Sequence, residues 1–168
     1  MKLIIETERL NLREFKVEDA PFILSLVNDP AWLQYIGDRK VYSVEDAERY
    51  LLDGSMKSYI DHGFGFWKVQ LKDTGEAMGS AGLAKRDYLE DVDLGFAFLP
   101  AFRSQGYAQE AALSIIHFAK ETLGMKDLVA ITDKQNASSI KLLMKLGFHF
   151  DRHFILEGEE LNLYSRSL

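Results

Sequence analysis

A polar turn in the middle of the chain carries residues suited to binding phosphate. The turn is Arg103-Ser104-Gln105-Gly106, and a helical spacing of apolar residues begins just after it, from Ala108. The first N–H groups of a helix have no partner within the helix, and the positive pole of the helix dipole lies behind them, so this end attracts phosphate. Gly106 has no Cβ to hold a ligand away, and Arg103 carries a planar, permanently charged fork. An ordinary turn that contains a glycine is the alternative.

The spacing of this turn differs from two common phosphate-binding motifs. Arg-x-x-Gly-x-Ala at 103–108 lacks the Gly-Lys-Ser/Thr of a Walker loop and the Gly-x-Gly-x-x-Gly of dinucleotide folds. The chain contains no cysteine, which excludes disulfides, thiolate metal sites and cysteine nucleophiles. The histidines do not have the spacing of metal ligands; they are His62, His117, His149 and His153. We therefore expect no metal in the site.

The elements on either side of the turn must position it. Apolar residues alternate with small ones over 94–99, which predicts a central strand that ends at Pro100. A helix predicted over 108–123 then crosses to 128–132, a short β-branched run typical of a buried parallel strand. Asn136 is the predicted N-cap of the helix that follows.

The remaining elements follow without internal repeats or linkers. Period-two alternation predicts further strands at 8–15, 64–71, 77–84, 148–156 and 160–166. Capping signals predict helices at 18–27, closed by Asn28-Asp29-Pro30, and from a Ser43 cap to about His62. This order predicts a single α+β domain over residues 1–168 with a mixed central sheet.

Composition and charge limit the classes of protein that fit. The chain has 168 residues, of which 47% are hydrophobic and 27% charged, an ordinary balance for a soluble domain. Its net charge of −6 argues against a nucleic-acid partner, because no basic stripe is available to neutralise phosphates. The apolar start is too short for a signal peptide, and no run approaches the roughly 20 residues of a membrane span. We expect a cytoplasmic protein without a membrane partner.

Two motifs together resemble one enzyme family. Arg103-x-x-Gly106-x-Ala108 is similar to the pyrophosphate loop of the Gcn5-related N-acetyltransferases (GNATs), and Asn136-x-x-Ser139 followed by Leu146-Gly147-Phe148 is similar to their second signature. The opening Glu6-Thr7-Glu8-Arg9-Leu10-x-Leu12-Arg13 resembles the branch that includes the ribosomal-protein N-terminal acetyltransferases. The resemblance implies a mixed, mostly antiparallel sheet of about seven strands, with a splayed parallel pair and four flanking helices.

The resemblance also implies acetyl-coenzyme A (acetyl-CoA) as the donor. The gap between the strand at 94–99 and the strand at 128–132 would hold the pantetheine arm, because splayed strands leave backbone groups unpaired. The residues implied for pantetheine and thioester are Phe96, Ala97, Phe98 and Leu99, with a backbone N–H near Ala97 or Phe98 polarising the thioester carbonyl. Those implied for the pyrophosphate are Arg103, Ser104, Gln105, Gly106, Tyr107 and Ala108. Asn136 and Ser139 would face the donor from the other wall.

Catalytic residues are implied less directly. Many family members have a tyrosine as general acid four residues before the glycine that ends the last helix, where this chain has Leu143. The resemblance implies Ser139 as the acid and Asp93 as the base in its place. For Ser139, an ordinary position in the first turn of a helix is the alternative, and for Asp93 a solvated strand edge. Asn136 has the alternative of a helix cap alone.

The implied reaction is direct acetyl transfer to a primary amine in a ternary complex. The α-amine of a protein or peptide N-terminus is the first candidate acceptor. A small-molecule amine such as a polyamine, an aminoglycoside or an amino acid is the second, because acceptor choice lies in the variable segments 30–62 and 85–91. A non-catalytic CoA-binding protein is a third possibility. Family members occur as monomers and homodimers, and both states stay open.

Overall fold

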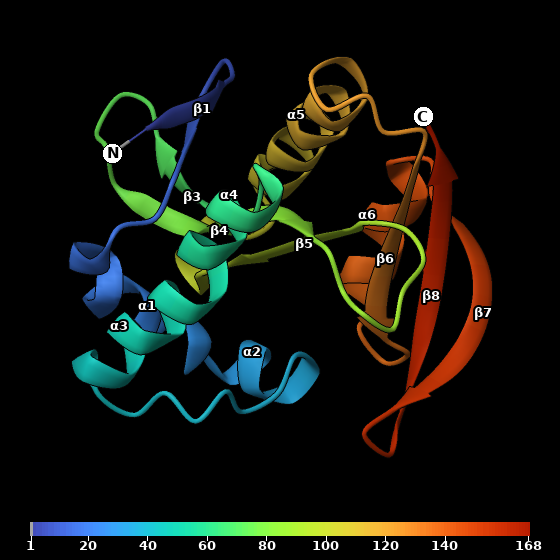
Figure 1. Cartoon of the computed structure of the whole chain (residues 1–168), viewed down its shortest axis with the longest axis horizontal. Coiled ribbons are helices and arrows are strands. Elements are labelled where there is room, and N and C mark those ends of the chain that lie inside the picture. The colour runs from blue at the N-terminus through green and yellow to red at the C-terminus, as the bar shows by residue number, and fades with distance from the viewer. Residues whose placement is uncertain (1) are drawn as a thin grey trace.

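The strands form one mixed sheet that is parallel at a single junction. The computed structural model describes residues 2–168. The sheet has eight strands in the order β1-β2-β3-β4-β5-β6-β8-β7 (Figure 1). Every neighbouring pair is antiparallel except β5 with β6. The strands are β1 (Leu3–Glu6), β2 (Leu10–Arg13), β3 (Phe66–Leu71), β4 (Ala77–Ala84), β5 (Asp93–Phe98), β6 (Asp127–Asp133), β7 (His149–Leu156) and β8 (Glu159–Ser167).

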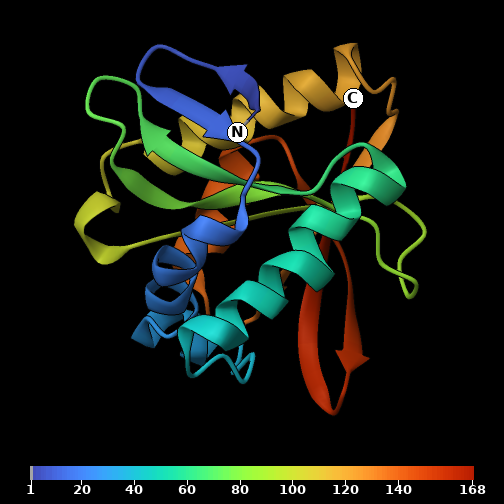
Figure 2. The same ribbon diagram turned by 60° about the vertical axis from the view of Figure 1, so that its left-hand side comes forward.

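Helices lie on both faces of this sheet. Figure 2 shows α3 and α4 running across the near face, with α5 behind the strands of the N-terminal half. The α-helices are α1 (Ala20–Val27), α2 (Pro30–Tyr35), α3 (Val44–Leu51), α4 (Lys57–His62), α5 (Tyr107–Glu121) and α6 (Ala137–Lys145). Short 3-10 helices are η1 (Val17–Asp19) and η3 (Pro100–Phe102), and η2 (Leu52–Met56) is a π-helical segment. None of the helices within residues 2–168 is long and apolar enough to span a membrane.

Of the hydrophobic cores, the two largest hold these layers together. The larger core joins the sheet to α5 and α6 through fully buried side chains such as Trp67, Ile115 and Leu143. The smaller core joins α1 to α3 through Ile23, Val27 and Leu51, among others. Burial of a side chain of this size stabilises the fold by about 1.5–3 kcal/mol. The cores therefore fix α5 and α6, whose N-termini border the site described below, against the central strands.

The predicted fold class is confirmed, and the splayed parallel pair consists of the two predicted strands, which are β5 and β6. β5 and β6 share one register pair, Asp93 with Val129, where Val129 N donates to Val92 O at 3.0 Å. On its other edge β6 pairs with β8 over its whole length. Strands β5 and β6 therefore separate beyond Asp93, and their facing backbone groups have no strand partner there.

Two elements differ from the predictions, and one predicted helix contains an irregular segment. The strand predicted at 8–15 is β2 alone, and β1 precedes it, because the Thr7 hydroxyl accepts a hydrogen bond from Leu10 N at 3.0 Å and turns the chain between the two. The predicted stop at Asp29-Pro30 instead begins α2, since Asp29 caps Ala31 N at 3.2 Å and proline is favoured in a first turn. The predicted helix from Ser43 to His62 is continuous, with η2 around Gly54.

Candidate active site

Two cavities meet along the open side of β5. The first, called here the loop cavity, has a volume of about 560 Å³ and lies against the turn at 103–108. The second, the sheet cavity, has a volume of about 580 Å³ and lies between β5, β6 and the tip of the β7–β8 hairpin. Both are lined by Phe96, Ala97, Asn136 and Ser139. These shared residues place the end of β5 and the start of α6 at the junction of the two cavities.

Most of the predicted binding residues reach the loop cavity. They are Phe96, Ala97, Phe98, Arg103, Ser104, Gly106, Tyr107, Ala108, Asn136 and Ser139. Leu99 and Gln105 line neither cavity. Leu99 N donates to Met78 O at 2.9 Å, and the Gln105 side chain donates to Ala101 O at 2.8 Å, so both residues are engaged within the protein.

The turn at 103–108 presents unpaired N–H groups to the loop cavity. Gly106 is the N-cap of α5, with a φ of 82°, and Ser104 has a φ of 61°. The first hydrogen bond of α5 runs from Glu110 N to Gly106 O at 3.0 Å. The N–H groups of Tyr107, Ala108 and Gln109 precede it and have no acceptor within the helix. Together with the helix dipole they form a helix end of the kind suited to an anion.

The guanidinium group of Arg103 is hydrogen-bonded within the protein, whereas the sequence suggested that it is free to bind a ligand. Its Nε donates to Phe98 O at 3.0 Å, and its Nη2 lies 2.5 Å from Asp29 Oδ2. Asp29 is buried and also caps α2. Arg103 therefore fixes the end of β5 and the start of α2 to the turn, and the Asp29 carboxylate offsets part of its charge.

The backbone of β5 offers alternate residues to the gap beside β6. In an antiparallel strand the N–H and C=O of one residue point to one side, and those of the next residue to the other. Val92 O accepts from β6, whereas Leu99 N donates to β4. The backbone N–H and C=O groups of the even-numbered residues therefore point into the gap, and those of Ala97 point toward its partner Ser80 on β4. Phe98 O already accepts from Arg103, so Phe96 and Phe98 offer the gap three backbone groups: Phe96 N–H, Phe96 C=O and Phe98 N–H.

The Asn136-x-x-Ser139 motif forms the facing wall. Asn136 is the N-cap of α6, and its Oδ1 accepts from Ser139 N at 3.2 Å. This confirms the predicted cap, and the same residue also lines both cavities. The cap fixes the first turn of α6 and so places the Ser139 side chain at the cavity junction. Leu143, one turn further, is 1% exposed and lines the sheet cavity with an apolar surface.

Asp93 lines the sheet cavity where β5 and β6 diverge. It is 3% exposed, so it is not a solvated strand edge. Arg86 Nε lies 2.8 Å from Asp93 Oδ2. Burial raises the pKa of Asp93 to about 6, against the opposing effect of Arg86 and the backbone N–H of Ile131. A carboxyl group with this pKa is ionised near neutral pH yet holds a proton more readily than an exposed aspartate.

Three residues of the site were not assigned from the sequence. Arg86 lies in the variable segment 85–91, and Trp32 and Tyr35 lie in the variable segment 30–62, on the unpredicted helix α2. Trp32 and Tyr35 line both cavities, and Arg86 lines the sheet cavity. The Asp-Pro pair at 29–30 was an available signal for α2, because a capping aspartate followed by proline also begins a helix.

Comparison with known proteins agrees with this geometry. Residues 9–149 match the model of the acetyltransferase (GNAT) domain. The chain is 26% identical over 146 residues to an uncharacterized N-acetyltransferase of Bacillus subtilis, YoaA, covering 86% of this chain and 82% of that one. The chain therefore belongs to the GNAT family and is an acetyl-transferring enzyme.

Solved structures share the fold over nearly the whole chain. An acetyltransferase from Agrobacterium tumefaciens is 25% identical, with a TM-score of 0.82 and coverage of 96% of this chain and 92% of that one. The ribosomal L7/L12 α-N-protein acetyltransferase RimL, solved in complex with coenzyme A, is 18% identical, with a TM-score of 0.82 and coverage of 99% and 98%. At that identity the second likeness concerns the fold alone.

Proposed function

We propose that this enzyme moves an acetyl group from acetyl-CoA to the α-amine of a protein or peptide N-terminus. The observation that carries the proposal is the meeting of the two cavities at Phe96, Ala97, Asn136 and Ser139. One cavity is built on a helix end suited to phosphate, and the other holds a buried carboxyl group. A donor entering from the first cavity and an amine entering from the second would react at their junction.

The residues present fit the proposed donor. The free N–H groups at the start of α5 suit its pyrophosphate. The unpaired Phe96 N–H and C=O suit the amides of the pantetheine arm, which would take the place of a missing strand partner. The N–H of Ala97 points toward β4, so Phe98 N–H is the better candidate of the two to donate a hydrogen bond to the thioester oxygen as negative charge develops there. Bound acetyl-CoA supplies an activated acyl carbon and a thiolate leaving group.

Asp93 and Ser139 are proposed to handle the two protons. Asp93 accepts the proton of the attacking amine through a water molecule, and Ser139 Oγ donates a proton to the departing thiolate and is reprotonated from solvent. The new N–C bond replaces the C–S bond in one transfer, since the chain has no cysteine to carry the acetyl group. Leu143 excludes a tyrosine acid at its position.

The pKa of Asp93 supports an α-amine over a more basic acceptor. An α-amino group has a pKa of about 7.7–8.0, whereas a lysine-like amine lies near 10.4. A base with a pKa of about 6 therefore deprotonates an α-amine against a difference of about two pKa units, and a lysine-like amine against more than four. Carboxylates at Asp38, Asp133, Glu157 and Glu159 line the same cavity and suit a cationic acceptor of either kind.

The experiment that tests the proposal is CoA release from acetyl-CoA across a panel of acceptors. The panel contains peptides that start with Ser, Ala or Met, together with polyamines, aminoglycosides and free amino acids. We expect selective turnover of peptides. Selective turnover of a small amine would assign the acceptor to that class with the donor site unchanged. Tight acetyl-CoA binding without acetylation of any amine would contradict the enzymatic proposal. A cytoplasmic location and a monomeric or homodimeric state remain predictions.

A further inference from the structure

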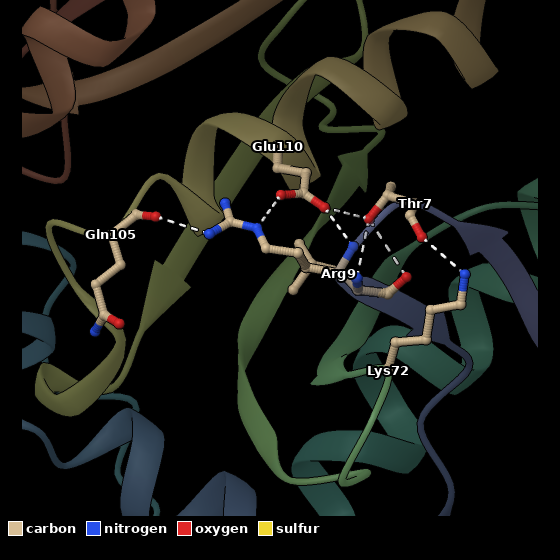
Figure 3. A network of polar contacts seen from close by, with 6 residues as sticks. Thr7, Arg9, Lys72, Gln105 and Glu110 are labelled. Carbon is tan, nitrogen blue, oxygen red and sulfur yellow. Dashed lines mark hydrogen bonds and ion pairs between the residues drawn. The ribbon is translucent and has the colours of Figure 1, made fainter.

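An arginine far from the turn in sequence is anchored beside it. Arg9 lies just before β2, and Glu110 lies in the first turn of α5 (Figure 3). Arg9 Nε donates to Glu110 Oε2 at 2.7 Å, and Arg9 N donates to Glu110 Oε1 at 2.9 Å. The Thr7 hydroxyl adds a third hydrogen bond to Glu110, at 2.7 Å. Against the effect of burial, these bonds hold the pKa of Glu110 below its usual range, so it stays charged near neutral pH.

The same guanidinium group reaches the turn itself. Arg9 Nη1 donates to Gln105 O at 3.1 Å, and the guanidinium carbon lies 4.3 Å from the centre of the Tyr107 ring. A Cβ built on Gly106 would lie 3.4 Å from Arg9 Nη2. Arg9 therefore covers one side of the turn from Gln105 to Tyr107. It does not line the loop cavity, whereas Gly106 and Tyr107 do.

The hydrogen bond to Gln105 O has a consequence for the neighbouring N–H. A trans peptide unit is planar, with its C=O and N–H pointing in opposite directions. Within residues 2–168 no peptide bond is cis. Holding Gln105 O toward Arg9 therefore turns Gly106 N–H away from Arg9. Gly106 accepts many backbone angles, so nothing in its own side chain prevents this peptide unit from rotating.

We propose that Arg9 is a positioning residue for the donor. By holding Gln105 O, it keeps Gly106 N–H aimed at the phosphate-binding side of the turn, and Glu110 holds Arg9 in place. Arg9 acts through the backbone of the turn and does not itself bind the donor. This inference rests on the proposed use of acetyl-CoA, and it deepens that proposal by assigning a role to a residue outside both cavities.

The test compares donors with and without a pyrophosphate. Arg9→Lys keeps a positive charge but loses the fork that joins Glu110 to Gln105. We expect about a tenfold increase in the Kd and KM for acetyl-CoA, with kcat and the KM for the acceptor unchanged. With S-acetylpantetheine, which lacks the pyrophosphate, we expect kcat/KM to equal that of the wild type. Arg9→Ala should behave in the same way with a larger effect.

A neighbouring residue provides the matched control. Lys72 Nζ donates to Thr7 O at 3.2 Å (Figure 3). It also pairs with Glu6, so it supports the same chain segment without touching the turn. Lys72→Ala should leave the Kd for acetyl-CoA unchanged. Equal losses for both donors in Arg9→Lys, or an unchanged Kd for acetyl-CoA, would overturn the inference while leaving the proposed function intact. A wild-type protein that does not bind acetyl-CoA would instead overturn both.

Discussion

At the scale of single residues, burial decides what Asp93 can do. An exposed aspartate is almost fully ionised at pH 5, whereas Asp93 has a pKa of about 6 because it is withdrawn from water. Its partner Arg86 stabilises the ionised carboxylate in the protein interior through an ion pair at 2.8 Å. The residue can therefore change its protonation state near neutral pH, which is the property that a general base needs.

The proposed base predicts a specific pH dependence. In the wild type, kcat/KM should fall about tenfold for each pH unit below about 6, as Asp93 becomes protonated. Asp93→Asn should lower kcat/KM at pH 8 by about 100-fold and remove the inflection near pH 6, leaving only the acidic limb set by the acceptor α-amine, whose pKa is about 7.7–8.0. The measurement is the pH–rate profile of both proteins between pH 5 and 9, with a peptide acceptor.

Ser139→Ala is the companion variant for this profile. It should lower kcat while keeping the inflection near pH 6, because Asp93 is intact. Full kcat in Ser139→Ala would remove Ser139 from the acid role, and an inflection near pH 6 that persists in Asp93→Asn would assign the base to another group. The pH dependence of the free energy of unfolding provides a further check on the pKa of Asp93. The folded-state pKa of Asp93 lies above its ordinary value, so its contribution to folding stability is present below about pH 4 and lost as the pH rises through about 6.

At the scale of elements, α5 links the turn to the core. Its buried face, including Ala111, Ala112 and Ile115, packs on the sheet, so the N-terminal N–H groups are held at a fixed place beside β5. Two glycines with positive φ stand at its ends: Gly106, with a φ of 82°, and Gly124, with a φ of 67°. Only Gly106 lies at the loop cavity.

These two glycines allow a matched comparison. An alanine in the left-handed region costs about 1–2 kcal/mol, so Gly106→Ala and Gly124→Ala should lower the free energy of unfolding by similar amounts. Only Gly106→Ala should weaken acetyl-CoA binding, by at least tenfold, because the strain of an alanine at a φ of 82° would shift the turn that borders the loop cavity. Urea unfolding and isothermal titration measure the two effects. Equal acetyl-CoA affinity in both variants would show that the turn does not bind the pyrophosphate.

The elements also show what could be predicted from the sequence and why. The strand, turn and helix around Gly106 were found because period-two and helical spacing, with glycine and proline at the boundaries, are local signals. The Asn136 cap was found for the same reason. α2 was missed because Asp29-Pro30 has the same composition whether it ends one helix or begins another. The contact of Arg9 with Glu110 spans 101 residues, and the burial of Asp93 depends on the whole sheet, so neither has a local signal.

At the scale of the whole molecule, the sheet consists of two parts that are joined by a single register pair. Strands β1 to β5 form one part and β6 to β8 the other, and the register pair of Asp93 with Val129 connects them. The core that α5 and α6 share with both parts of the sheet supplies a further tie across the site. A ligand that contacts both walls would therefore add to the cohesion of the fold.

Donor binding should raise the thermal stability of the protein. At an acetyl-CoA concentration 100 times the Kd, linkage adds about 2.7 kcal/mol, which corresponds to an increase in Tm of about 5–10 °C for a chain of this length. Hydrogen exchange should locate the effect. The amides of Phe96 and Phe98 should exchange more slowly with acetyl-CoA bound, whereas Ala97 and Leu99 are already paired with β4 in the free protein. Equal protection of all four amides on binding would contradict a donor lying in the gap.

The divergence of β5 and β6 gives this protein strand edges inside the molecule as well as at its rim. Open edges at a rim invite pairing with other proteins, and the outer strand β7 is of this kind. The inner edges border a cavity walled by α2, α6 and the β7–β8 hairpin. These walls cover the inner edges, so another protein strand cannot approach them as it can approach the rim. The inner edges can thus stay unpaired without inviting other proteins, and under the proposed function the donor is the strand partner that the sheet lacks.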